Sequence, residues 1–194
     1  MTESTQIKQP RKRFRSPPYP ALGLGRAVER AAQLHKIAQH HEVGVATLQE
    51  AWEMKSAEGR VWRTAAALIQ YGLLTDSGTG KARKFKVTDI GRRVILDSDP
   101  NSTKRKEALN TVALKPMIHK ELWDKFGAAS NVSDSLFRTH LTVDRVEANE
   151  APYSENSANE VIETYRKTLD YSGLANLTEI SGQEKIETDA EKIE

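Results

Sequence analysis

The chain has 194 residues, of which 38% are hydrophobic, 6% aromatic and 29% charged. This length suits one domain of ordinary size or two small domains packed together. The absence of cysteine excludes a disulfide framework, a thiolate zinc site and a cysteine nucleophile. The longest apolar run, residues 65–69, cannot span a bilayer, and the basic, polar start lacks the apolar segment of a secretory signal. We therefore expect an intracellular protein, cytoplasmic by default.

The formal net charge of +2 conceals an asymmetry along the chain. Residues 1–127 contain 23 Lys and Arg against 13 Asp and Glu, a balance of +10. Residues 128–194 contain 6 against 14, a balance of −8. A basic front and an acidic back predict that one part of the chain meets a polyanion. An incidental difference between two solvated surfaces is the alternative.

Residues 1–20 combine low apolar content with clustered positive charge and prolines, which is typical of a disordered arm. Such an arm can follow a phosphate backbone or enter a minor groove, and it can equally be a solubilising tail. If the arm binds DNA, its candidate contacts are Arg11, Lys12 and Arg13.

Hydrophobic spacing and capping residues predict alternating helices and short strands between residues 22 and 97. Thr47 and Ser56 have the positions of two helix starts, and Gly72 has the position of a helix stop. The predicted order is a helix at 24–39, a short strand at 41–45, helices at 48–54 and 56–71, strands at 73–75 and 81–88 around a turn at 76–80, and a helix at 89–96.

Two helices joined by a tight turn and followed by a β-hairpin resemble a winged helix-turn-helix. The similarity to the DNA-binding domain of prokaryotic regulators is most specific in residues 70–74, Gln-Tyr-Gly-Leu-Leu, and 87–96, Val-Thr-Asp-Ile-Gly-Arg-Arg-Val-Ile-Leu. In those proteins the recognition helix closes on a Tyr/Phe-Gly-Leu/Ile step, and the second wing strand runs into a Leu/Val-Thr-x-x-Gly turn. The resemblance covers roughly residues 22–97 and implies a DNA-binding domain at 21–97.

The second half of the chain predicts a helical domain at 106–174, after a polar link at 98–105 and before an acidic flexible tail at 175–194. The overall class is therefore mainly α with one small β-hairpin. The expected helices are 103–114, 116–126 with Pro116 in the first turn, one from Ser133 to residue 141, and 157–172 opened by Ser157. Their helix-turn-helix order leaves open a degenerate second winged helix. The apolar stripes of 116–126 and 157–172 suit either a homodimer surface or an internal core.

The positive charges around the predicted recognition helix, 56–71, carry the functional hypothesis. Lys55 lies just before this helix, and Arg60, Arg63 and Thr64 are expected to project from its first half. In helix-turn-helix proteins this half enters the major groove. The planar fork of arginine suits it to bond both guanine acceptors or to clamp a phosphate. Arginines that merely cover a surface helix are the alternative.

The second wing strand adds four cations, Lys81, Arg83, Lys84 and Lys86. A period of two turns Lys84 and Lys86 outward, with Phe85 facing the body of the domain. Repulsion among these cations would be relieved by a phosphate backbone. A charged edge strand is also a common protection against aggregation.

Other motifs do not support catalysis, a metal or a cofactor. Residues 77–81, Ser-Gly-Thr-Gly-Lys, lack the glycine spacing and the following helix of a phosphate-binding loop. The histidines at positions 35, 40 and 41 lack the cysteines or carboxylates of a closed zinc site. His119 lies near Glu121 and Asp124, but no nucleophile or oxyanion turn accompanies it. We expect no enzyme activity.

The sequence therefore predicts a double-stranded DNA-binding protein, a transcriptional regulator or a similar sequence-directed factor. Helix 56–71 would read the major groove, and the wing at 81–86 would bind phosphates. The main alternative is a protein–protein adaptor on a winged-helix scaffold with weak, nonspecific nucleic-acid binding. RNA binding by the same basic face is a further alternative, although the exposed aromatics usual in RNA recognition are missing.

Overall fold

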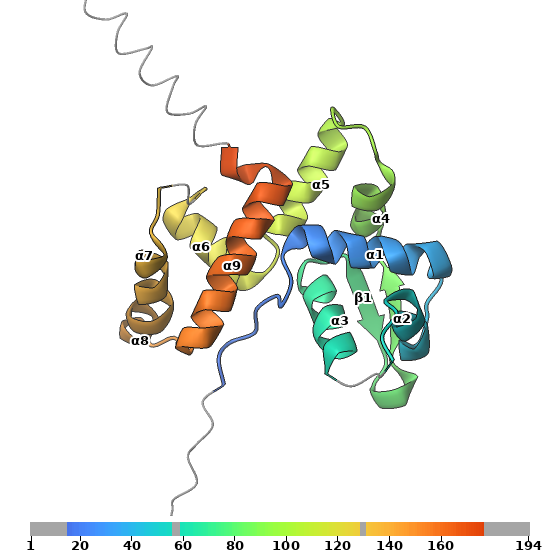
Figure 1. Cartoon of the computed structure of the whole chain (residues 1–194), viewed down its shortest axis with the longest axis horizontal. Helices are drawn as coiled ribbons and strands as arrows, with labels where there is room; N and C mark the ends of the chain where they lie inside the picture. The colour runs from blue at the N-terminus through green and yellow to red at the C-terminus, as the bar shows by residue number, and fades with distance from the viewer. Residues whose placement is uncertain (1–14, 56–58, 129–130, 177–194) are drawn as a thin grey trace, which may run out of the picture.

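The computed structural model describes residues 15–55, 59–128 and 131–176. The chain is mainly helical with one small antiparallel hairpin, which confirms the predicted class at that level (Figure 1). In chain order the elements are α1 (Leu24–Ala38), α2 (Val45–Ala51), α3 (Arg60–Gln70), β1 (Leu74–Ser77), a 3-10 turn (Gly80–Ala82), β2 (Lys84–Val87), α4 (Asp89–Leu96), α5 (Thr103–Ala113), α6 (Met117–Phe126), α7 (Asp134–Thr139), a π-helical turn (His140–Asp144), α8 (Arg145–Glu147), α9 (Glu155–Ser172) and a final 3-10 turn (Leu174–Asn176).

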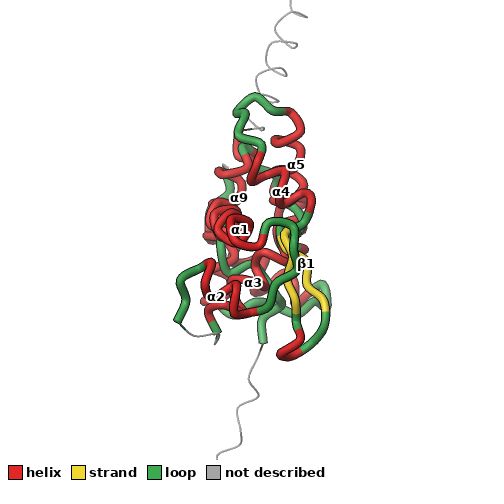
Figure 2. Tube along the Cα trace, turned by 90° about the vertical axis from the view of Figure 1, so that its right-hand side faces the viewer, coloured by secondary structure: helices red, strands yellow, loops and turns green. Residues whose placement is uncertain are grey.

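α1 connects the two halves of the molecule. It crosses above α2 and α3 and contacts α4 and β2, while its first turns pack against α9 (Figure 1). Figure 2 shows α1 end-on, with α2 and α3 below it and the two strands to one side. α4 packs against α5, and α5 packs against α9. Because α1 and α4 precede the predicted link at 98–105 and α9 follows it, helices on both sides of the link share one hydrophobic core.

The small sheet extends beyond the two named strands. β1 and β2 pair in antiparallel register, with Leu74 opposite Val87 and Ser77 opposite Lys84. The predicted short strand at 41–45 is reduced to one bridge, in which Val43 and Phe85 exchange both backbone hydrogen bonds at 2.8 and 2.9 Å. The predicted strand 81–88 is shorter than expected because residues 80–82 form a 3-10 turn.

α3 ends in a left-handed glycine, as predicted. Gly72 has a φ of +71°. The backbone N–H groups of Gly72 and Leu73 donate to the carbonyl oxygens of Ile69 and Leu68 at 2.8 and 2.9 Å. This pattern satisfies the last carbonyls of the helix and turns the chain directly toward β1.

Two predicted helix starts are wrong because neighbouring segments decide them. α2 begins at Val45 after an extended Gly44, so Thr47 lies inside the helix and caps nothing. α9 begins at Glu155, two residues before the predicted Ser157, and its N-cap is Ser154. There the Ser154 side chain accepts a hydrogen bond from the Ser157 N–H at 3.3 Å, and the Ser154 N–H donates to Ser16 at 3.0 Å. Ser154 is therefore the N-cap, since its side-chain oxygen satisfies a backbone N–H group in the first turn of the helix.

The described residues after position 97 form helices and loops without a strand. Ser133 caps α7, as predicted. Pro116, predicted in the first turn of its helix, is instead the N-cap that directly precedes α6. The helix that begins at α7 continues past residue 141 through the π-helical turn into α8. The apolar stripes of α6 and α9 face the internal core, since these side chains are at most 4% exposed: Ile118, Leu122, Val161, Ile162, Tyr165 and Leu169. Of the two roles predicted for these stripes, the internal core is correct.

Residues 15–22, which we call the strap, lie against α9 and α3. The prediction of a disordered arm is wrong for residues 15–20, because tertiary contacts hold them. The Tyr19 hydroxyl donates to the Glu160 carboxylate at 2.9 Å, and the Gln70 side-chain amide donates to the Tyr19 carbonyl at 3.3 Å. The strap therefore fills the space between two helices that are far apart in sequence.

Among the described residues, none of the helices has the length and apolar composition that crossing a bilayer requires.

The Thr-x-x-Gly step at residues 88–91 fixes the corner between the hairpin and α4. The Thr88 hydroxyl donates to the Gly72 carbonyl at 2.6 Å and accepts from the Gly91 N–H at 3.0 Å. α4 lies so close to the preceding segment that a Cβ at position 91 would stand 2.6 Å from the Leu73 carbonyl oxygen. Because the obstructing atom belongs to the backbone, no side chain fits there without moving the corner.

We expect Gly91→Ala to lower the free energy of unfolding by about 1–3 kcal/mol. The clash outweighs the helix propensity of alanine, which favours Ala over Gly by about 1 kcal/mol. Equilibrium urea unfolding measures the difference. Gly44→Ala is the matched control, because a Cβ at position 44 meets only the Lys84 ammonium, at 4.0 Å. Equal losses from the two substitutions would contradict the proposed role of Gly91.

Candidate nucleic-acid interface

The first half of α3 presents two arginines to solvent and buries its threonine. Arg60 and Arg63 are exposed, as predicted. Thr64 is 5% exposed and lies in the same buried stripe as Val61 and Leu68, so its predicted contact with a base is wrong. The helical spacing places position 64 three residues after Val61 and four before Leu68, which turns it toward the core.

Four exposed cations gather toward one end of the molecule, which we call the basic end: Lys55, Arg60, Lys84 and Lys86. Lys55 follows α2, Arg60 begins α3, and Lys84 and Lys86 lie on the outward face of β2, as predicted from the period of two. The start of α3 and the tip of the hairpin lie at the same end in Figure 1. Within the described residues none of these four cations has an ion-pair partner, so their charge is available to an anion.

Arg83 does not extend toward solvent in the way predicted for a phosphate contact. Its guanidinium pairs with Asp76 on β1 at 2.7 Å and lies 5.5 Å from the ring centroid of Trp62 on α3. The ion pair joins the two arms of the hairpin, and the cation–π contact holds the hairpin against α3. The side chain of Lys81 and the residues Arg11, Lys12 and Arg13 lie outside the part of the chain that the structure describes, as does the predicted start at Ser56.

α1 contributes two arginines that the sequence did not single out. Burial, together with the charges of Arg26 and Arg60, lowers the pKa of Arg30. Arg30 donates to the Trp52 carbonyl at 3.2 Å, and the Trp52 indole donates to the Arg30 carbonyl at 2.9 Å. The spacing of four residues between Arg26 and Arg30 on one helix could have indicated a positive face, but only tertiary packing brings it beside α3.

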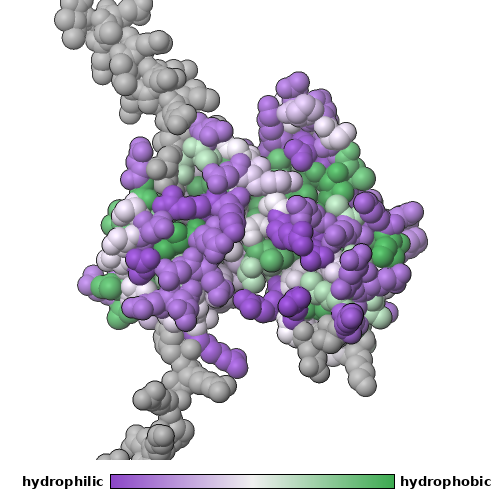
Figure 3. Space-filling model, viewed as in Figure 1, coloured by the Kyte–Doolittle hydropathy of each residue, from purple (hydrophilic) through white to green (hydrophobic). Residues whose placement is uncertain are grey.

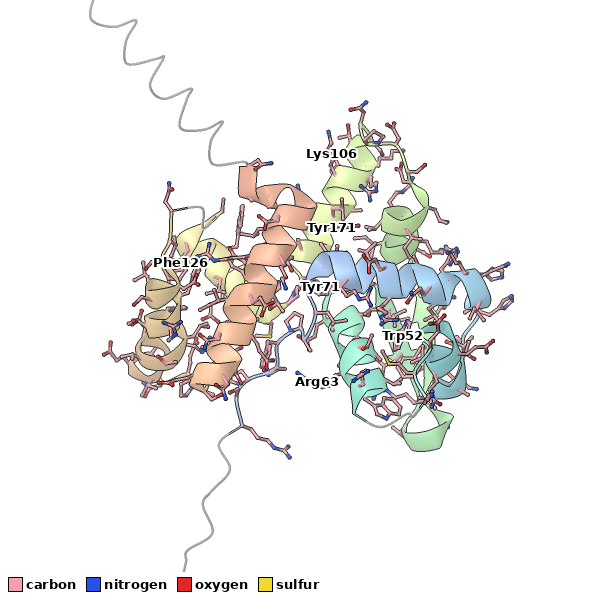
Figure 4. The ribbon with its side chains drawn as sticks, in the orientation of Figure 1. Trp52, Arg63, Tyr71, Lys106, Phe126 and Tyr171 are labelled. Carbon is pink, nitrogen blue, oxygen red and sulfur yellow. The ribbon has the colours of Figure 1, made fainter. Side chains whose placement is uncertain are left out.

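An acidic side chain of α9 adjoins the exposed face of α3. Arg63 Nη2 lies 3.5 Å from Glu160 Oε2. Figure 4 shows Arg63 on the side of α3 that faces α9, and Figure 3 shows hydrophilic side chains along this part of the surface. Arg63 and Glu160 also border an open cavity of about 450 Å³ between α1, α3 and α9. Sequence spacing gives no indication of this contact, because 97 residues separate its partners.

The charged groups at the opposite side of α9 are paired among themselves. Glu121 on α6 accepts a hydrogen bond from His140 Nε2 at 2.9 Å and is ion-paired with Arg145. Lys125 donates to Asp144 at 2.8 Å and lies 2.8 Å from His140 Nδ1. This network joins α6 to the π-helical turn and leaves its cations less available to a ligand than those of the basic end.

His119, the histidine considered for catalysis, is fully buried. Its ring lies between Tyr71 and Tyr165, with centroid distances of 5.7 and 5.5 Å. Nδ1 lies 3.3 Å from the Ala113 carbonyl oxygen, whereas the buried Nε2 has no hydrogen-bond partner among the described atoms. Within the same residues no group of three side chains could hold a metal ion. The ring is a core residue that must stay neutral.

Comparison with known proteins yields no matching family model, no matching curated protein and no matching solved structure.

The burial of His119 predicts a specific loss of stability in acid. Burial lowers its pKa from an ordinary 6.5 to about 4, so between these pH values the unfolded chain binds more protons than the folded one. The contribution of neutral His119 to the free energy of unfolding is therefore fully present above pH 6.5, and it is lost as the pH falls toward 4. The loss at pH 4.5 amounts to about 2–3 kcal/mol.

We expect His119→Phe, which cannot titrate, to remove this part of the acid sensitivity. Urea unfolding of both proteins at pH 7.5 and pH 4.5 isolates the effect, because other titrating groups contribute equally to each. The original chain should lose about 2–3 kcal/mol more than the variant between the two pH values. The same loss in both proteins would show that His119 does not titrate as its burial requires.

Proposed function

We propose that the chain binds double-stranded DNA, with the first half of α3 in the major groove and the outward face of β2 on the phosphate backbone. The observation that carries the proposal is the basic end, where Lys55, Arg60, Lys84 and Lys86 are exposed and lack acidic partners among the described residues. Unpaired cations concentrated at one end favour a polyanion, because phosphates replace the counterions that would otherwise neutralise them.

The arrangement of elements supports a winged helix-turn-helix as the scaffold. α2 and α3 are joined by a short segment, and the hairpin follows α3 directly. Val43, which precedes α2, pairs with β2 on the edge opposite to β1, so one small sheet holds the hairpin beside α3. In a helix-turn-helix the second helix enters the major groove with its N-terminal residues on base edges. Arg60 and Arg63 are at that end of α3.

The two arginines and the two lysines have different proposed roles. Arg60 and Arg63 suit base edges, because a guanidinium can donate two parallel hydrogen bonds to guanine. Lys84 and Lys86 suit phosphates, since an ammonium is a compact charge without a fixed fork. A transcriptional regulator or a similar sequence-directed factor is the function that this division favours. The symmetry of the selected DNA site would indicate its oligomeric state, because a palindromic site matches a two-fold symmetric dimer.

Selection from a pool of random duplexes, at low and near-physiological salt, tests the proposed function. We expect one enriched motif that persists at the higher salt, and a palindromic motif would indicate a dimer. Binding without a motif would leave an architectural role. Absence of binding at either salt would contradict the proposal. It would favour the alternative of an adaptor whose basic end binds an acidic protein partner.

Two substitutions distinguish base contacts from phosphate contacts. Arg63→Ala should weaken the selected sequence by about 1–3 kcal/mol more than it weakens random DNA. Lys84→Ala should weaken all sequences alike and reduce the slope of log affinity against log salt by about one. Fluorescence anisotropy with labelled duplexes measures both effects.

Lys120→Ala is the control for both variants, because it removes one positive charge from α6, where Lys120 pairs with Asp124. Its affinity for either duplex should stay close to that of the original chain. Equal, small changes from Arg63→Ala and Lys84→Ala would contradict the assignment of α3 as the recognition helix.

A further inference from the structure

Arg63 differs from the cations of the basic end because an acid of α9 stands beside it. Its guanidinium lies 3.5 Å from the Glu160 carboxylate, and the two side chains are 65% and 48% exposed. A pair as exposed as this one contributes little to stability. Arg63 can therefore leave Glu160 for another ligand without loss of the fold. The pair matters for function through the effect of Glu160 on the ligands of Arg63.

Other contacts hold the Glu160 carboxylate in place. The Tyr19 hydroxyl donates to the same Oε2 atom at 2.9 Å, and the strap that carries Tyr19 is fixed by Gln70 at the end of α3. The Glu160 carboxylate therefore keeps a fixed position on the surface beside α3, and its side chain is not free to move away.

A ligand of Arg63 must accept its hydrogen bonds within about 3 Å of the guanidinium. Such a ligand lies close to Glu160, so their electrostatic interaction depends on the charge of the ligand. A phosphate oxygen carries negative charge and is repelled by the carboxylate, whereas guanine O6 and N7 are neutral acceptors. The same carboxylate thus disfavours one class of Arg63 contact more than the other.

We propose, on the basis of the DNA-binding function above, that Glu160 is a specificity-determining residue. Its carboxylate disfavours phosphates at Arg63 and reserves the guanidinium for the neutral acceptors of a base edge. The acidic C-terminal half thereby sharpens the reading of sequence by the basic N-terminal half. Juxtaposed like charges generally act in this way, since they suppress the wrong partner more than they weaken the right one.

Glu160→Gln tests the proposal and keeps the side-chain shape and an oxygen for the Tyr19 hydroxyl. We expect this variant to bind random-sequence duplexes about two- to fivefold more tightly, the range of an exposed charge interaction. Affinity for the selected duplex should rise less, so the ratio of the two affinities should fall. Anisotropy titrations of both duplexes at two salt concentrations give this ratio, and the effect should shrink at the higher salt.

Glu163→Gln is the matched control. It makes the same change of charge on the same helix, but the ion-pair partner of Glu163 is Lys167, at 2.5 Å, and not Arg63. We expect the affinity ratio of this variant to change less than half as much. Glu160→Gln is also introduced into the Arg63→Ala variant, where it should leave the ratio unchanged because the guanidinium is gone.

The outcomes separate the inference from the function on which it rests. If the original chain binds duplex DNA but Glu160→Gln and Glu163→Gln alter the ratio equally, the inference is overturned and the proposed function stands. A Glu160→Gln effect that persists in the Arg63→Ala variant overturns it as well, since general repulsion would then be the cause. If neither the original chain nor Glu160→Gln binds any duplex, both proposals fail.

Discussion

The buried hydroxyl of Tyr71 is the point at which four parts of the chain meet. It lies 2.9 Å from the Leu22 carbonyl oxygen and 2.8 Å from the Thr168 hydroxyl, which in turn accepts the Leu24 N–H at 3.2 Å. Buried polar groups are costly without partners, so the strap, the start of α1, the end of α3 and the middle of α9 must keep these positions together. Burial also raises the pKa of Tyr71 above its ordinary value, because the ionised form would lose its hydration.

This junction sets the register of α3 against α9. Arg63 precedes Tyr71 by eight residues, and Glu160 precedes Thr168 by the same number. Eight residues of helix are about 12 Å long, and α3 and α9 begin at the same end of the molecule in Figure 1. Both helices run from that end toward the junction at Tyr71 and Thr168. Arg63 and Glu160 therefore lie at equal distances along their helices from the junction, and their side chains come into contact.

Which cations can bind a ligand depends more on their ion-pair partners than on where the charges fall along the sequence. Acids and bases of α6 and the π-helical turn neutralise one another, and Arg83 is held by Asp76. The cations without an ion-pair partner among the described residues include Arg60 at the start of α3 and Lys84 and Lys86 on the outer face of β2. The charge split along the sequence indicated a polyanion partner in general, but only the contacts distinguish a bracing arginine from one available to a ligand.

Local patterns determined the elements of the first half. Apolar spacing predicted α1, Gly72 predicted the end of α3, and the alternation in Lys84-Phe85-Lys86 predicted which side chains of β2 face outward. These features depend on residues within a few positions of each other, as helix stops and strand faces do. The sequence motif Thr-x-x-Gly identified Gly91. The motif did not show why glycine is needed there, namely that the Leu73 carbonyl oxygen lies against α4 at this position.

Tertiary structure decided what depends on distant partners. Ser154 rather than Ser157 caps α9, and its N–H group donates to Ser16 in the strap. Residues 15–20 are ordered because α9 and α3 offer them contacts. Thr64 is buried, although the sequence suggested that it projects with the arginines. Composition, periodicity and capping thus determined the class of fold and the outward lysines of the hairpin. Which cations remain free, and which acid stands beside Arg63, was decided by long-range packing, because electrostatic pairing follows distance in space and not separation along the chain.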